Sequence, residues 1–140
     1  MKNIKETILY SFLFFLLIAA DQAKKLIVLS HPEQYSIFKN DHFAFSLNVP
    51  TVAMYFIYIV LLCALVIWFG QKKYKQAVTK LGFVFILAGA LSNIGERIIR
   101  GYVVDFIHIH TGVLNAADFY ILAGILLLLL ETDKKTDKAS

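Results

Sequence analysis

The run VAMYFIYIVLLCALVIWFG, residues 52–70, holds no charged side chain, and it decides the class of fold. A helix needs about 20 apolar residues to cross a hydrocarbon core of about 30 Å, and this run meets that requirement. In lipid the backbone amides must be satisfied within the protein, so a helix is the expected conformation. The whole sequence agrees, because 59% of its 140 residues are hydrophobic and 17% are charged, whereas about a quarter of a soluble domain is charged.

Three further apolar runs flank this one, so we predict an all-α integral membrane protein with four transmembrane helices in a single domain, residues 1–140. The predicted spans are residues 7–29, 52–70, 77–100 and 115–130, and a polar cytoplasmic tail follows at 131–140. The first span has a competing interpretation as a secretory signal peptide, since lysines precede an apolar stretch that ends in Ala19 and Ala20. The three later spans favour an uncleaved helix. The one cysteine, Cys63, excludes an internal disulfide framework.

Lysine and arginine residues predict the orientation of the bundle, because they collect in short cytoplasmic segments. Nine lie on the predicted inner side: Lys2, Lys5, Lys72, Lys73, Lys75, Lys80, Lys134, Lys135 and Lys138. Five lie on the other side or at its helix ends: Lys24, Lys25, Lys39, Arg97 and Arg100. We therefore expect both termini in the cytoplasm. A basic fringe at the membrane surface accounts for the net charge of +4, so no nucleic-acid partner is expected.

The two outer connections are more than simple loops. Residues 43–49 alternate apolar side chains with small or polar ones, which predicts an extracytoplasmic strand with one apolar face between the first two helices. We expect this strand to lie on the membrane surface or over a cavity between helices. The second connection, residues 101–115, contains Asp105 and a shorter alternation at 107–110 before a Thr-Gly turn.

The acidic residues indicate where a functional site lies. Four are in the cytoplasmic tails, where water solvates them. The other six lie on the outer side: Asp21, Glu33, Asp41, Glu96, Asp105 and Asp118. Four of these six are at or beside helix ends, and an ionisable group near hydrocarbon usually faces a polar cavity and has a function. The sequence therefore predicts a carboxylate site at the outer membrane boundary.

Several of these residues also have a purely structural interpretation. Asn115 suits the N-cap of the last helix with Asp118 in its first turn, a role compatible with catalysis. Glu96 lies four residues before an arginine and is interpreted as one half of an ordinary ion pair with it. Asp21 and Lys25, also four apart, have the same interpretation.

Other conspicuous residues receive structural interpretations only. His108 and His110 are assigned to a loop or an interface, because no third ligand is spaced to complete a metal site with them. The small residues Gly82, Gly89 and the alanines on either side of Gly89 predict a close approach between helices. We expect neither a metal nor a cofactor.

Five motifs together resemble the lipoprotein signal peptidases, also called signal peptidase II. They are DxxxK at 21–25, Ala-Phe-Ser at 44–46, NIGER at 93–97, GYVVDF at 101–106 and NAAD at 115–118. They follow in order along nearly the whole chain, and VVDF followed by NAAD is the most specific part. The resemblance implies a bacterial enzyme that cleaves prolipoprotein signal peptides immediately before a diacylglyceryl-modified cysteine.

By position, the resemblance implies that Asp105 and Asp118 are the catalytic aspartates. It also implies supporting or substrate-binding roles for six residues: Asp21, Lys25, Asn40, Asn93, Arg97 and Asn115. The sequence departs from the family motif Asn-x-Gly-Ala-Ala-Phe-Ser at His42 and Phe43, and from Gly-Asn-x-x-Asp-Arg at Ser92 and Glu96. These departures affect the path of the outer strand and the alignment of Asn40, and they leave the catalytic pair intact.

Two aspartates suit peptide hydrolysis, because one can deprotonate water while the other polarises the carbonyl group. Such a pair shares one proton and titrates as a unit, and burial raises its proton affinity. A lipidated precursor would enter sideways from the membrane, so the expected partners of this monomer are that precursor and lipids. The strand at 43–49 is a plausible clamp over the entrance.

Two other classes of protein fit parts of the pattern. A small transporter or a proton-pathway subunit also places carboxylates inside a bundle, but residues 52–70 are uncharged and 119–130 hold no acid or base. A non-catalytic assembly protein would tolerate asparagine at Asp105 or Asp118, and a peptidase would not.

Overall fold

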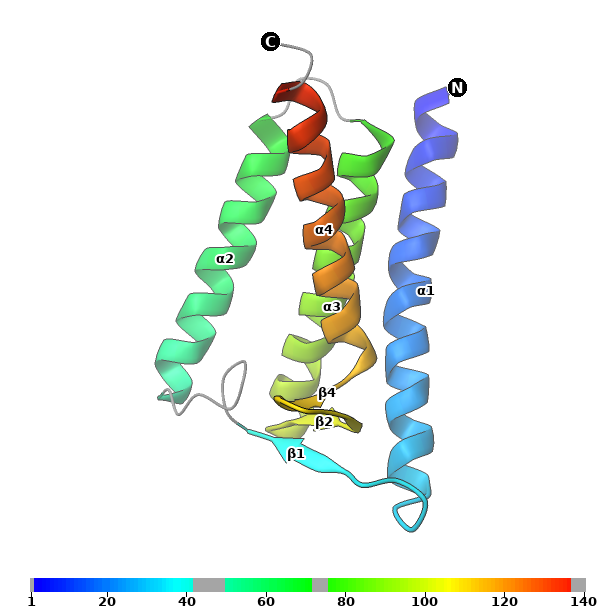
Figure 1. Cartoon of the computed structure of the whole chain (residues 1–140), viewed down its shortest axis with the longest axis vertical. Coiled ribbons are helices and arrows are strands. Elements are labelled where there is room, and N and C mark those ends of the chain that lie inside the picture. The colour runs from blue at the N-terminus through cyan, green and yellow to red at the C-terminus, as the bar shows by residue number, and fades with distance from the viewer. Residues whose placement is uncertain (1, 42–49, 72–75, 137–140) are drawn as a thin grey trace.

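The computed structural model describes residues 2–41, 50–71 and 76–136, and four helices dominate it (Figure 1). They are α1 (Lys2–Ser30), α2 (Thr51–Gln71), α3 (Ala77–Arg100) and α4 (Ala116–Thr136). Within the described ranges, α2 and α3 are long and apolar enough to cross a membrane, and the apolar part of α4, Ala116–Leu130, is shorter. The start of α1 and the end of α4 lie at the same end of the molecule (Figure 1).

Helices α3 and α4 form the tightest contact of the bundle. A side chain at Gly82 would meet the carbonyl oxygen of Gly124 at 2.9 Å, and one at Gly89 would overlap the carbonyl oxygen of Ala117. Ala88 beside them is fully buried. The small residues therefore let the two backbones approach, as the sequence predicted.

Helix α2 stands apart from the other three along most of its length (Figure 1). Its ring contact with α3 is the stack of Phe69 on Phe83, with centroids 3.9 Å apart. Met54 is buried, but most of the large apolar side chains of α2 are exposed. Such an apolar surface suits contact with lipid.

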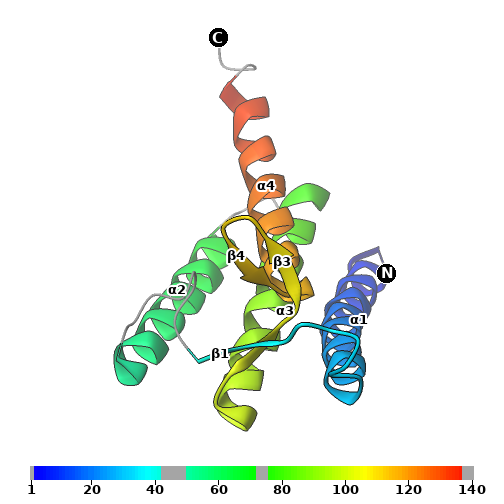
Figure 2. The same cartoon turned by 60° about the horizontal axis from the view of Figure 1, so that its bottom comes forward.

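Short strands connect the helices at the end opposite the termini. They are β1 (Phe38–Asn40), β2 (Val103–Asp105), β3 (Ile107–Ile109) and β4 (Gly112–Leu114). Strand β1 pairs antiparallel with β2, with Phe38 opposite Asp105, while β3 and β4 form a hairpin. Figure 2 shows β1 crossing beneath the helix ends from α1 towards the side of α2.

The predicted β-element between the first two helices exists as β1, whereas the predicted strand at 43–49 lies outside the described residues. The alternation at 107–110 forms β3 and its turn. The fold prediction did not include β2, β3 and β4 between α3 and α4. The chain turns there because Gly101 directly follows the last residue of α3. Gly101 adopts a left-handed conformation (φ 80°) and donates its N–H to the carbonyl of Arg97 at 2.9 Å.

Candidate active site

Asp105 ends strand β2, and its carboxyl group is almost completely buried. Val103 and Val104, which precede it, are also buried, because β-branched residues favour a packed strand. The side-chain amide of Asn40 donates to Oδ2 of Asp105 at 2.9 Å, and that of Asn115 donates to Oδ1 at 2.6 Å. Burial raises the pKa of Asp105, and the two amide donors oppose this increase because they stabilise the ionised form.

Asp118 lies in the first turn of α4. The backbone N–H of Asn115 donates to Oδ2 of Asp118 at 3.0 Å, and the N–H of Asp118 donates to Oδ1 of Asn115 at 3.2 Å. This reciprocal pair has the form of a capping box, so the predicted N-cap is confirmed. The side-chain amide of Asn93 donates to Oδ1 of Asp118 at 2.9 Å. The same carboxylate therefore caps α4 and lies in the candidate active site.

Asn115 joins the two aspartates. Its side chain donates to Asp105 and its main chain donates to Asp118. The negative charge of Asp118 also raises the pKa of Asp105, which places the two groups within electrostatic range of each other.

A second group of charges is buried next to this pair. The ammonium group of Lys25 lies 2.9 Å from Asp21, 2.7 Å from Glu96 and 2.9 Å from Oδ1 of Asn93. Asp21 also accepts hydrogen bonds from Ser92 Oγ at 2.7 Å and from the backbone N–H of Ala117 at 3.1 Å. These contacts link α1, α3 and the start of α4.

The predicted pairing of Asp21 with Lys25 is confirmed at 2.9 Å. Both side chains are nevertheless fully buried and also contact other parts of the bundle: Glu96, Asn93, Ser92 and the backbone of Ala117. The predicted pairing of Glu96 with Arg100 is confirmed at 2.5 Å. Glu96 is nevertheless buried and also holds Lys25. The position of Glu96 four residues before Arg100 predicted its contact with Arg100. No local pattern in the sequence predicted its contact with Lys25.

Arg97 is buried on the face of α3 that also carries Asn93. Its guanidinium carbon lies 5.5 Å from the centre of the Tyr58 ring, within the range of a cation–π contact. Tyr58 belongs to α2 and was missed, because a neutral residue within an apolar run carries no distinguishing signal. Gln22 was also missed, and its amide donates to Ser92 Oγ at 2.8 Å.

The structure thus brings most of the predicted site residues together. Three amides donate directly to the carboxyl pair: those of Asn40, Asn93 and Asn115. Lys25 contacts Asn93, and Asp21 contacts Lys25. Arg97 is placed by its contact with the Tyr58 ring. His108 and His110 are exposed on the hairpin, where His108 lies 3.3 Å from Ser36. In the part of the chain that the structure describes, no three histidine, cysteine or acidic side chains gather as a metal site.

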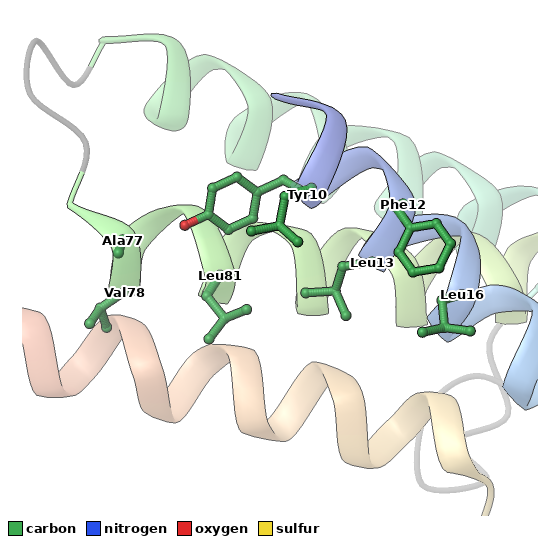
Figure 3. Close-up of a pocket in the computed structure, with 8 residues that line it drawn as sticks. Tyr10, Phe12, Leu13, Leu16, Ala77, Val78 and Leu81 are labelled. Carbon is green, nitrogen blue, oxygen red and sulfur yellow. The ribbon is translucent and has the colours of Figure 1, made fainter. Parts of the chain in front are cut away.

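Two grooves lie towards the other end of the helices. One, of about 430 Å³, is apolar and separates α1 from α3 (Figure 3). Its lining is Leu9, Tyr10, Phe12, Leu13, Leu16, Ala77, Val78 and Leu81. The other, of about 630 Å³, lies between α1, α2 and α3 beside the ion pair of Glu6 and Lys80. Neither groove contains a residue of the carboxyl pair, so neither defines the site.

The fold and the site together define a helical membrane protein that keeps two coupled carboxyl groups among amide donors at the end of its bundle. Residues 13–133 match the family model described as signal peptidase (SPase) II. The chain belongs to the signal peptidase II family, whose members are peptidases.

Relatives agree with this assignment, and a solved structure shares the fold. A lipoprotein signal peptidase of Alteromonas mediterranea is 37% identical over 78 residues, covering 52% of this chain and 43% of that protein. One of Fusobacterium nucleatum is 28% identical over 146 residues, covering 92% and 88%. The first of these alignments, like that with the Caldicellulosiruptor bescii relative, spans half or less of the relative's length. A solved bacterial membrane enzyme has the same fold, with a TM-score of 0.80 at 20% identity over 94% of this chain and 91% of its own.

Proposed function

We propose that this protein is an aspartic endopeptidase of the bacterial cytoplasmic membrane, with Asp105 and Asp118 as its catalytic pair. The observation that supports this most is the placement of both carboxyl groups, buried Asp105 and half-buried Asp118, on Asn115, which donates to one through its side chain and to the other through its main chain. Such an arrangement holds two acids in fixed relative positions before substrate arrives.

The chemistry requires one ionised and one protonated carboxyl group. The ionised group takes a proton from water as the oxygen attacks the scissile carbonyl carbon, while the protonated group donates to the carbonyl oxygen. The tetrahedral intermediate collapses when the nitrogen of the leaving peptide receives a proton and the C–N bond breaks. Burial and mutual repulsion favour the singly protonated pair, because two adjacent negative charges cannot both be solvated there. Either aspartate can take either role in this scheme.

The proposed substrate is a diacylglyceryl-modified prolipoprotein, cut just before its lipidated cysteine. Membership of a family whose relatives are named lipoprotein signal peptidases supports this proposal. All four helices are proposed to cross the membrane, with both termini in the cytoplasm and the carboxyl pair near the outer surface. The monomer then receives its lipid-anchored substrate sideways from the bilayer.

The test is cleavage of a lipidated precursor peptide in detergent micelles by wild type, Asp105→Asn and Asp118→Asn. Loss of general acid–base catalysis lowers a rate by about 10²–10⁴-fold, so we expect both variants to fall by that factor. The matched control is Asp41→Asn, which changes an exposed acid on the same side of the bundle. Full activity in either active-site variant would refute the proposal.

A transporter or a proton-pathway subunit is less well supported. The buried charges described here gather at the end of the bundle that carries the strands, and the residues of α4 from 119 to 130 include no acid or base. A conducting route needs polar groups along its length.

A further inference from the structure

The ammonium group of Lys25 makes three contacts inside the protein. It donates to the side-chain oxygen of Asn93 at 2.9 Å, and it forms ion pairs with the carboxylates of Asp21 and Glu96. The side chains of Lys25, Asp21 and Glu96 are fully buried. The three contacts together hold the ammonium group between two carboxylates and one amide.

This arrangement determines which way the Asn93 amide faces. An ammonium group only donates, so the atom of Asn93 that it contacts must be the carbonyl oxygen. The NH₂ group of the amide then faces Asp118 and donates to it at 2.9 Å. If Lys25 moved away, the amide could rotate and present its oxygen to the aspartate, which would replace a hydrogen bond with repulsion.

Glu96 holds Lys25 in this position from α3. Its Oε2 lies 2.7 Å from the ammonium group, and its Oε1 lies 2.5 Å from Arg100. Without the charge on Glu96, Asp21 would be the remaining carboxylate partner of Lys25, and it would draw the ammonium group towards α1 and away from Asn93. Neither the ion-pair interpretation nor the family resemblance gave Glu96 a part in the reaction.

We propose that Glu96 is a positioning residue for the reaction: through Lys25 it fixes the Asn93 amide that orients the Asp118 carboxylate. This inference rests on the proposed peptidase activity. Glu96 touches neither Asp105 nor Asp118 by any contact described above, so its effect on the chemistry passes along the sequence of contacts from Glu96 to Lys25, Asn93 and Asp118.

The test measures kcat and KM for the lipidated precursor peptide with Glu96→Gln, which keeps the shape and removes the charge. We expect kcat to fall about 10- to 100-fold while KM stays within about twofold, because the amide that orients the catalytic group is disturbed rather than a substrate contact. The matched control is Arg100→Gln, which removes the partly exposed partner of Glu96 and leaves Lys25 in place. Its kcat should stay within about twofold of wild type.

Three further variants separate positioning from folding. Glu96→Asp keeps the charge and should return kcat to within about threefold of wild type. In an Asn93→Ala background, Glu96→Gln should add little further loss, since the amide through which it acts is already absent. If Glu96→Gln does not accumulate, the charge-balanced variant Lys25→Met/Glu96→Gln replaces it and should show the same loss of kcat.

Three outcomes would overturn the inference while leaving the peptidase assignment intact. They are a wild-type kcat in Glu96→Gln or its charge-balanced substitute, an equal loss in Arg100→Gln, and full additivity with Asn93→Ala. Failure of the wild-type protein to cleave the peptide is a different result, because it refutes the proposed function and this inference together.

Discussion

Replacing Asn115 separates its two functions, the cap of α4 and the hydrogen bond to Asp105. The bond from its amide to the Asp105 carboxylate is 2.6 Å long and buried, and hydrogen bonds to charged groups contribute about 1.5–3 kcal/mol. Since each 1.36 kcal/mol is a factor of ten in rate, its loss in Asn115→Ala should lower kcat about 10- to 150-fold if the whole bond acts in the transition state. Loss of the cap should also lower the free energy of unfolding by about 0.5–2 kcal/mol.

Asn115→Ser is the matched control for this experiment. Serine is as good an N-cap as asparagine, but it has no amide to donate to Asp105. We therefore expect Asn115→Ser to unfold at nearly the wild-type temperature and to lose as much kcat as Asn115→Ala.

The pH profile gives an independent reading of the same contact. The amide of Asn115 lowers the pKa of Asp105 because it stabilises the ionised form, so removing it raises that pKa further. The acidic limb of the activity profile should then move to higher pH in Asn115→Ser, as measured by peptide cleavage across buffers of constant ionic strength. Wild-type kcat with an unmoved acidic limb would refute this account of Asn115.

Three further predictions concern the stability of the fold and the contact between Tyr58 and Arg97. The pKa of Asp105 is raised above its ordinary value of 3.8, so the folded protein binds that proton more tightly than the unfolded chain does. This stabilisation is lost as pH rises through the folded pKa. The melting temperature of the wild type should therefore fall over that pH range, and that of Asp105→Asn should fall less. Gly89→Ala should destabilise the α3–α4 contact by about 1–3 kcal/mol. Gly95→Ala should instead stabilise α3 by about 0.5–1 kcal/mol, because nothing lies within 4 Å of the added carbon. Thermal unfolding in detergent measures both effects. Tyr58→Leu should lower kcat/KM about 2- to 30-fold, because a cation–π contact of about 0.5–2 kcal/mol with Arg97 is lost.

Each of these has an outcome that contradicts it. A melting temperature that rises with pH over that range would show that the amide donors stabilise the carboxylate of Asp105 more than burial penalises it. Equal effects of alanine at the two glycines would mean that the close approach of α3 and α4 is not tight. A wild-type kcat/KM in Tyr58→Leu would show that the contact of the Tyr58 ring with Arg97 does not contribute to activity.

Local patterns in the sequence were enough to predict the helices. Apolar runs mark where a chain enters lipid, and α3 covers the same residues, 77–100, as the predicted third span. At the end of α4 the pattern was less informative, because the helix continues to Thr136 through charged residues that are good helix formers. Strand β1 pairs with β2 across more than sixty residues of sequence, and no local pattern of three residues predicts such a distant partner.

In the candidate site, too, local contacts could be predicted from the sequence and contacts between distant segments could not. Asn115 and Asp118 lie three residues apart, so their capping contact could be read from spacing. Glu96 and Lys25 lie on different helices, and their contact depends on how α1 packs against α3. Tyr58 could not be found, since its importance comes from the guanidinium group that happens to lie over its ring.

The pairing of β1 with β2 affects when the protein can become active during its synthesis. Asp105 depends on Asn40 from the connection after α1 and on Asn115 at the start of α4, so its surroundings are drawn from both halves of the chain. Asp118 is itself part of α4, which is the last of the four helices to leave the ribosome. A nascent chain that has inserted only its first three helices therefore lacks one aspartate and the amide that joins the pair. On the proposed mechanism, peptidase activity begins only when α4 has taken its place.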